Sequence, residues 1–265
     1  MTIMEHIVLF IIGLIGSFFS GLLGIGGAII NYPLLLYVPV WFNVDSFSAK
    51  EVADISIFQV FFSSLAGVLA YRFQTKDEGP VVHKRLVMNM GISILVGSLI
   101  GSLSSNYLPN ETINIVYGVL AIIAVILMLF PNHGEKKHFN IAQIRFNPWI
   151  AAACAFLVGI ASGIVGAGGA FMLIPIMLTV LKIPTRVTVA SSLAIVFISA
   201  VGGMTGKIAA GGIPFWPTLF VVIGSLLGAP LGSFVSRRLN VKYLRVCLAV
   251  LIAATAIKIW VDILT

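Results

Sequence analysis

About ten long apolar segments follow one another along this chain, and they constrain its fold more than any other feature. They cover about residues 3–23, 26–40, 52–72, 86–106, 112–130, 148–166, 168–181, 187–206, 214–235 and 243–264. Only 9% of the 265 residues are charged, against about 25% in a typical soluble domain. The pattern therefore predicts an all-α, polytopic membrane protein.

Segment length limits how many of these stretches cross the bilayer. A spanning helix needs about 20 residues to cross a hydrocarbon core of ~30 Å. The segments at 26–40 and 168–181 are shorter than this. We therefore expect about 8 to 10 transmembrane segments. Each short segment either crosses alone or forms a re-entrant hairpin with the segment before it.

Positive charge indicates the orientation of the chain. Most of the sixteen Lys and Arg residues lie in four places, which are the polar linker near residues 131–147 and the loops after the segments at 52–72, 168–181 and 214–235. Cytoplasmic loops of membrane proteins are enriched in Lys and Arg. We therefore expect these loops on the cytoplasmic side of a multi-pass protein of the cell (inner) membrane, with both termini outside. Topology accounts for the net charge of +7, so no nucleic-acid partner is expected.

One motif occurs twice, as SGLLGIGGAIINYP at Ser20–Pro33 and as SGIVGAGGAFMLIP at Ser162–Pro175. Shorter matches accompany it, because Gly97 and Gly101 correspond to Gly228 and Gly232. These glycine pairs are expected to let helices pack closely. We interpret the pattern as a duplication, with a first repeat at 1–130, a cytoplasmic linker at 131–147 and a second repeat at 148–265. Five segments per repeat, an odd number, predicts two inverted five-segment repeats, each with a helix broken at its glycine-rich motif.

The glycine breaks are the strongest candidates for a binding site. Non-helical backbone survives at membrane depth only where protein or a water-filled cavity satisfies it. Glycines leave backbone N–H groups accessible, and a helix that starts there directs the positive end of its dipole at the break. The breaks therefore predict an anion site without a buried cation, although the same glycines would also suit tight helix packing alone. The candidate residues are Gly24, Gly26, Gly27, Gly166, Gly168 and Gly169, with Ser20 and Ser162 as hydroxyl donors.

Further polar residues are predicted at membrane depth. Asp54 is the most deeply embedded acid, and we consider it a candidate for proton or cation coupling, or else an acid at a hydrated helix end near Lys50. Ser191, Ser192 and Gln59 are candidates to line the cavity and to donate to an oxyanion. Serine also bonds back to its own helix, which is the alternative for both serines.

The paired S-G-x-x-G-x-G-G-A-x-x-x-x-P motifs, the stretch TVASSLAIVFISAVGG at residues 188–203 and the two halves around a basic linker resemble the sulfite exporter TauE/SafE family of membrane permeases. The resemblance implies a secondary permease that moves a small anion such as sulfite, thiosulfate or a sulfonate by alternating access. An uncoupled anion channel or a membrane sensor of the same ligands is the alternative. One departure is that Asp54 stands where the second half has Ser191, which argues against an exactly two-fold site.

Enzymatic activity is not expected, because the apolar segments carry few ionisable groups. No cofactor and no metal site are expected either. Cys154 and Cys247 lie in apolar stretches and are interpreted as small packing residues. The expected partners are the small anionic substrate, membrane lipid and a coupling proton or cation. The sequence leaves open the substrate, its direction of movement, the coupling ion and the oligomeric state.

Overall fold

The computed structural model describes residues 3–23, 28–42, 46–74, 82–129, 146–236, 246, 250, 253–254 and 257–261. Within this part of the chain, the principal helices are α1 (Ile3–Leu23), α2 (Ala28–Trp41), α3 (Ala49–Gln74), α4 (Lys84–Ser105), α5 (Asn110–Leu129), α6 (Pro148–Val165), α7 (Ala170–Thr179), α8 (Thr185–Ala210) and α9 (Phe215–Ser236). The described part contains no strand. The predicted all-α architecture is confirmed.

Seven of the described helices are long and apolar enough to cross a membrane, namely α1, α3, α4, α5, α6, α8 and α9. The short helices α2 and α7, with 14 and 10 residues, match the two segments that the sequence marks as too short to span alone. Proline interrupts both of them, at Pro33 and Pro39 in α2 and at Pro175 in α7. Most of the predicted segment at 243–264 lies outside the described residues.

Glycine contacts join helices from opposite halves of the chain. The helix α1 packs along α9, and α4 packs along α6. A Cβ at Gly101 of α4 would collide with the carbonyl of Ile160 in α6, and a Cβ at Gly228 of α9 would collide with the carbonyl of Leu14 in α1. The two glycine pairs therefore bring backbones into direct contact, as the sequence predicts.

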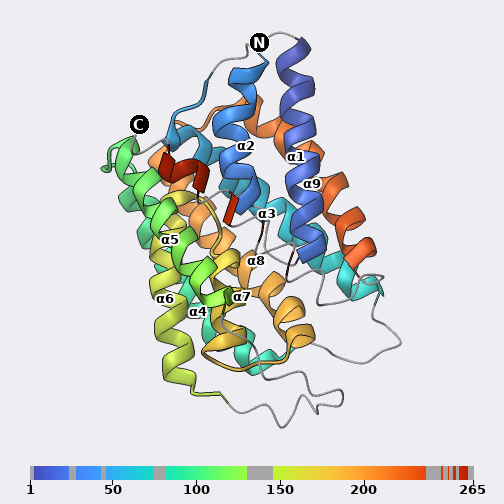
Figure 1. Cartoon of the computed structure of the whole chain (residues 1–265), viewed down its shortest axis with the longest axis vertical. Helices are drawn as coiled ribbons and strands as arrows, with labels where there is room; N and C mark the ends of the chain where they lie inside the picture. The colour runs from blue at the N-terminus through green and yellow to red at the C-terminus, as the bar shows by residue number, and fades with distance from the viewer. Residues whose placement is uncertain are drawn as a thin grey trace.

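The two helix pairs also indicate how the halves are related. In Figure 1, the N-terminal end of α1 lies at the top of the molecule, whereas the N-terminal end of α6 lies at the bottom. These helices carry the two copies of the glycine motif at their C-terminal ends, and they run in opposite directions. Inverted repeats would produce this arrangement, although the division of the chain into repeats stays a prediction.

The helices α3 and α8 occupy the interior of the molecule. They are the most buried of the candidate spans; they contact each other, and α3 also contacts α9 while α8 contacts α4. The outer helices expose apolar side chains, such as Met88 of α4, Leu157 of α6 and Leu231 of α9. An apolar exterior suits a lipid environment, so the interior around α3 and α8 is where polar chemistry is expected.

Candidate functional site

The second glycine motif forms a break between two helices. The helix α6 ends at Val165, and Gly166 follows it with φ of 74°. Gly168 and Gly169 also have positive φ, at 62° and 76°, and α7 starts directly afterwards at Ala170. L-residues with side chains rarely adopt this region of φ. Glycine is therefore required here to turn the chain, and no side chain caps the start of α7.

Protein atoms surround the Cα atoms of this break. A Cβ at Gly166 would collide with the carbonyl of Ala53 in α3, and a Cβ at Gly168 would lie 2.5 Å from Val60 Cγ1 and 3.4 Å from Val196 Cγ1. Val60 is the twelfth residue of α3 and Val196 the twelfth of α8, each helix having 26 residues. The break therefore lies near the middle of both central helices. The first motif's Gly24, Gly26 and Gly27 lie outside the described residues.

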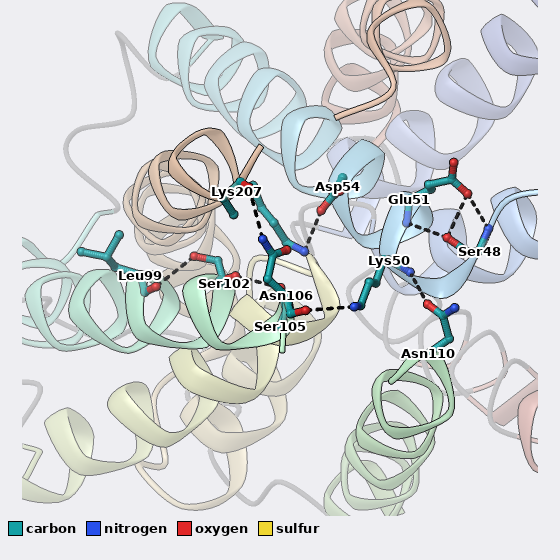
Figure 2. Close-up of polar contacts among 11 residues, drawn as sticks. Ser48, Lys50, Glu51, Asp54, Leu99, Ser102, Ser105, Asn106, Asn110 and Lys207 are labelled. Carbon is teal, nitrogen blue, oxygen red and sulfur yellow. Dashed lines mark hydrogen bonds and ion pairs between the residues drawn. The ribbon is translucent and has the colours of Figure 1, made fainter. Parts of the chain in front are cut away.

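A buried ion pair lies on α3 beside this break. Lys207 Nζ of α8 lies 2.6 Å from Asp54 Oδ1 of α3, and the two side chains are only 1% and 8% exposed. Asp54 follows Ala53, whose carbonyl contacts Gly166. Figure 2 shows the lysine reaching from α8 toward the carboxylate. The pair thus connects the two central helices next to the glycine break.

A turn between α4 and α5 supports the helix ends around the pair. Asn106 donates from Nδ2 to the carbonyl of Ala210 at 3.3 Å, and its own carbonyl accepts from Lys50 Nζ at 2.9 Å. Asn110 Oδ1 accepts from the backbone N–H of Lys50 at 3.2 Å. These contacts connect the start of α3 with the end of α8 (Figure 2).

Lys207 is a residue that the sequence reasoning missed. The apolar pattern predicts a segment ending at residue 206, which leaves Lys207 just beyond it and outside the four basic loops. In the structure α8 continues to Ala210, and Lys207 is 1% exposed. Neither its Nζ nor Asp54 Oδ1 makes a further hydrogen bond among the described residues. An acid embedded in an apolar segment indicates that a partner cation should be sought on a neighbouring helix.

The other predicted site residues have different surroundings. Ser162 donates to the carbonyl of Gly159 at 3.2 Å, and Ser192 donates to the carbonyl of Val189 at 2.9 Å, so both bond within their own helices. Ser191 Oγ accepts from the backbone N–H of His83 at 3.1 Å. Ser162 Oγ also lies 3.1 Å from the Cβ position of Gly169. The structure therefore brings Ser162 to the second break.

Two predicted residues belong to a separate polar group around α1. Gln59 Nε2 donates to the carbonyl of Gly13 at 3.3 Å and to Ser17 Oγ at 2.9 Å. Ser20 Oγ is buried without a hydrogen-bond partner among the described residues. Gln59 therefore bonds to α1, the helix that carries Ser20, whereas Asp54 pairs with α8.

Comparison with known proteins identifies the family. The family model for the sulfite exporter TauE/SafE matches residues 9–259. The chain belongs to the sulfite exporter TauE/SafE family. A probable membrane transporter protein, YunE, of Bacillus subtilis is 25% identical to it over 90% of this chain and 91% of its own length.

Further relatives carry the same description. A probable membrane transporter protein of Methanocaldococcus jannaschii is 26% identical, with 92% of this chain and 89% of the relative covered. A probable membrane transporter protein of Xylella fastidiosa is 27% identical, with 98% of this chain and 97% of the relative covered. No solved structure matches the chain. Together with the seven apolar helices, these relatives make this TauE/SafE chain a multi-pass membrane transporter of a small molecule.

Proposed function

We propose that this transporter moves a small sulfur-containing anion, such as sulfite, thiosulfate or a sulfonate, by alternating access. The observation that carries the proposal is the Lys207 ammonium, which is buried where the start of α3 meets the end of α8 and whose one partner among the described residues is Asp54. An ammonium has three donors, and a single carboxylate contact leaves donors for another oxyanion. The family description supports sulfite-like anions as the class.

Asp54 makes such a site reversible. A fixed lysine at membrane depth would hold an anion strongly, because the surroundings screen little. A neighbouring carboxylate competes for the same ammonium, so the anion binds by displacing Asp54 and leaves when Asp54 returns. The start of α7 lies next to the break and adds the positive end of a helix dipole. The glycine site, which the sequence predicts without a buried cation, then acts as one site with the buried Lys207 ammonium.

The same exchange accounts for coupling at Asp54. When an anion takes Lys207, Asp54 becomes a buried charge without a partner, which is unfavourable. Binding a proton removes that charge, so anion and proton are taken up together. The other charged groups close to Asp54 among the described residues are Lys50 and Glu51 of α3. Their opposite charges largely offset each other.

Flux into proteoliposomes tests this function. The panel contains sulfite, thiosulfate, sulfoacetate and sulfate, each with and without a proton gradient directed inward. We expect at least one sulfur anion to accumulate against its gradient, and an inward proton gradient to increase its uptake. The double variant Asp54→Asn/Lys207→Gln keeps the position of the ion pair neutral and should lose this uptake.

The panel also separates the alternative function. Fast flux that only dissipates an anion gradient, unaffected by the proton gradient, would indicate an uncoupled channel. Binding of the anion without any flux would indicate a sensor. Uptake of none of the four anions would contradict the proposed substrate class. Unchanged proton-driven uptake in the double variant would contradict the role of the ion pair.

A further inference from the structure

A second group of buried polar side chains lies between α1, α2 and α3, away from the ion pair. Gln59 of α3 reaches the carbonyl of Gly13 and Ser17 Oγ on α1. Asn31 of α2 packs against α1 at Gly16, because its Oδ1 occupies the space that a Cβ at Gly16 would need. Residues 13, 16, 17 and 20 share one face of a helix. We call Ser17, Ser20, Asn31 and Gln59 the α1 polar cluster.

The cluster is buried and only partly hydrogen bonded. All four side chains are 0% exposed. Ser20 Oγ, both amide atoms of Asn31 and Gln59 Oε1 have no hydrogen-bond partner among the described residues. Buried polar atoms are nearly always paired, and leaving several unpaired in one place costs free energy. The arrangement therefore calls for a ligand.

Three of the four unpaired atoms, which are Ser20 Oγ, Asn31 Oδ1 and Gln59 Oε1, can accept, whereas Asn31 Nδ2 can only donate. The acceptors are in the majority, which favours a cation over an anion. The carbonyl of Gly13 can only accept, so it fixes the donating nitrogen of Gln59 on that side and leaves Oε1 as a free acceptor. Ser20 lies in the last turn of α1, which ends at Leu23. The last carbonyls of a helix lack intrahelical partners and carry the negative end of its dipole.

The chemistry of these oxygens selects the kind of cation. All four side chains are neutral, whereas Ca²⁺ and Mg²⁺ sites normally contain carboxylates. None of them titrates, so the cluster does not bind protons. Among the described residues there is also no group of three His, Cys, Asp or Glu side chains that would suit a transition metal. Neutral oxygens next to a broken helix are a known environment for Na⁺ in transporters.

Comparison of the two halves sets this cluster apart. At the matching positions of the second motif, Asn31 corresponds to Leu173, and Gln59 corresponds to Val196 in α8. Leu173 and Val196 are fully buried. The second half thus fills the same place with apolar side chains, which shows that the polar residues are not needed for packing alone.

We propose that the α1 polar cluster binds a monovalent cation of the sodium type, through side-chain oxygens of Ser17, Ser20, Asn31 and Gln59 and the terminal carbonyls of α1. Its use as a coupling ion rests on the proposed anion transport, but the binding itself does not. Asp54 pairs with Lys207 of α8 and is not a member of the α1 polar cluster, so this cation site is separate from the ion pair.

Thermal unfolding of the full-length protein in detergent tests the site without any anion substrate. The protein is titrated with NaCl at constant ionic strength, with choline chloride as the balancing salt and KCl and LiCl as comparators. We expect Na⁺ to raise the unfolding temperature in a saturable way, more than K⁺ does. Binding to the folded state alone produces such a shift. An equal response to all salts, or none, would overturn the proposal.

Two exchanges use the residues of the second half and therefore preserve packing. Asn31→Leu and Gln59→Val should each weaken Na⁺ binding at least about tenfold, which is the loss of one good ligand. Asn31→Asp places a charge at the same atoms and should strengthen Na⁺ binding while making the protein less stable in choline. A sodium response that persists unchanged in both Asn31→Leu and Gln59→Val would contradict the proposal.

Separate outcomes distinguish this site from the proposed function. One outcome is a sodium-specific shift of the unfolding temperature that persists in Asp54→Asn/Lys207→Gln, while the wild type takes up no sulfur anion. It would contradict the proposed substrate class and support the cation site. Anion uptake driven by a proton gradient, without any sodium-specific shift of the unfolding temperature, would support the proposed function and contradict the cation site.

Discussion

At the scale of single residues, the start of α3 and the end of α8 are held together by the buried charges of Asp54 and Lys207. Lys207 and Asp54 are nearly inaccessible, and no other described group bonds to the two paired atoms. Removing one member of a buried pair leaves an uncompensated charge and typically costs about 3–5 kcal/mol, whereas replacing both members is far better tolerated.

We therefore predict a strongly non-additive mutant cycle. Asp54→Asn and Lys207→Gln should each lower the free energy of unfolding by about 3–5 kcal/mol, and the double variant should recover most of this loss. Thermal unfolding in detergent measures the effect. The matched control is Lys84→Gln at the exposed start of α4, which should change stability little. Additive losses in the double variant would show that the two residues do not depend on each other.

The same residues show where prediction from sequence reached its limit. Asp54 stands out as an acid in an apolar stretch, so it is found from the sequence alone. Lys207 lies only one residue beyond the predicted segment. Whether it faces water or the interior depends on whether the helix continues for one more turn. The partners of Gln59 come from α1, some forty residues away, and no local pattern encodes that contact.

At the scale of helices, the sequence predicts the elements well but does not predict which helices pair. The bounds of α1, α4, α5, α6 and α9 agree with the apolar segments within about two residues. The helices α3 and α8 extend further, because their polar ends continue the helix beyond the apolar run. The partners of α1 and α4 come from the opposite half, and hydropathy carries no information on which helices meet.

The close backbone contact between α4 and α6 leads to a prediction about two glycine-to-alanine variants. A Cβ at Gly101 would collide with the backbone of Ile160. A Cβ at Gly67 of α3 would make only ordinary contacts, at 3.4 and 3.9 Å with the side chain of Leu193 and at 3.9 Å with Ser233 Oγ. Gly101→Ala should therefore destabilise the protein. Gly67→Ala should be neutral or stabilise it by up to about 1 kcal/mol through helix propensity.

Thermal unfolding of the two variants, with size-exclusion profiles as a check on folding, compares them directly. Both positions lie inside helices and receive the same added methyl group, so the difference isolates the helix contact. Equal effects at the two positions would contradict the close approach of α4 and α6.

At the scale of the whole molecule, the two cross-half helix pairs surround a central layer of α3, α8 and the break before α7. Pairing of α1 with α9 and of α4 with α6 divides the molecule into two similar outer units. Rocking of such units around a central site is how inverted-repeat transporters expose one site to each side in turn. Alternating access therefore requires that the part of α3 next to the break becomes accessible from both faces of the membrane.

Thiol accessibility of Ser56 tests this requirement most directly. Ser56 is buried, its Oγ has no partner among the described residues, and it lies one helical turn from both Ala53 and Val60, which contact the break. The experiment places Ser56→Cys in a background lacking Cys154 and Cys247 and applies a membrane-impermeant thiol reagent to each face separately. Leu157→Cys, on the exposed outer side of α6, is the control and should stay unlabelled in lipid.

We predict that the reagent modifies Ser56→Cys from both faces, and that the transported anion slows modification from each. Modification from one face only, unaffected by the anion, would contradict alternating access at this site.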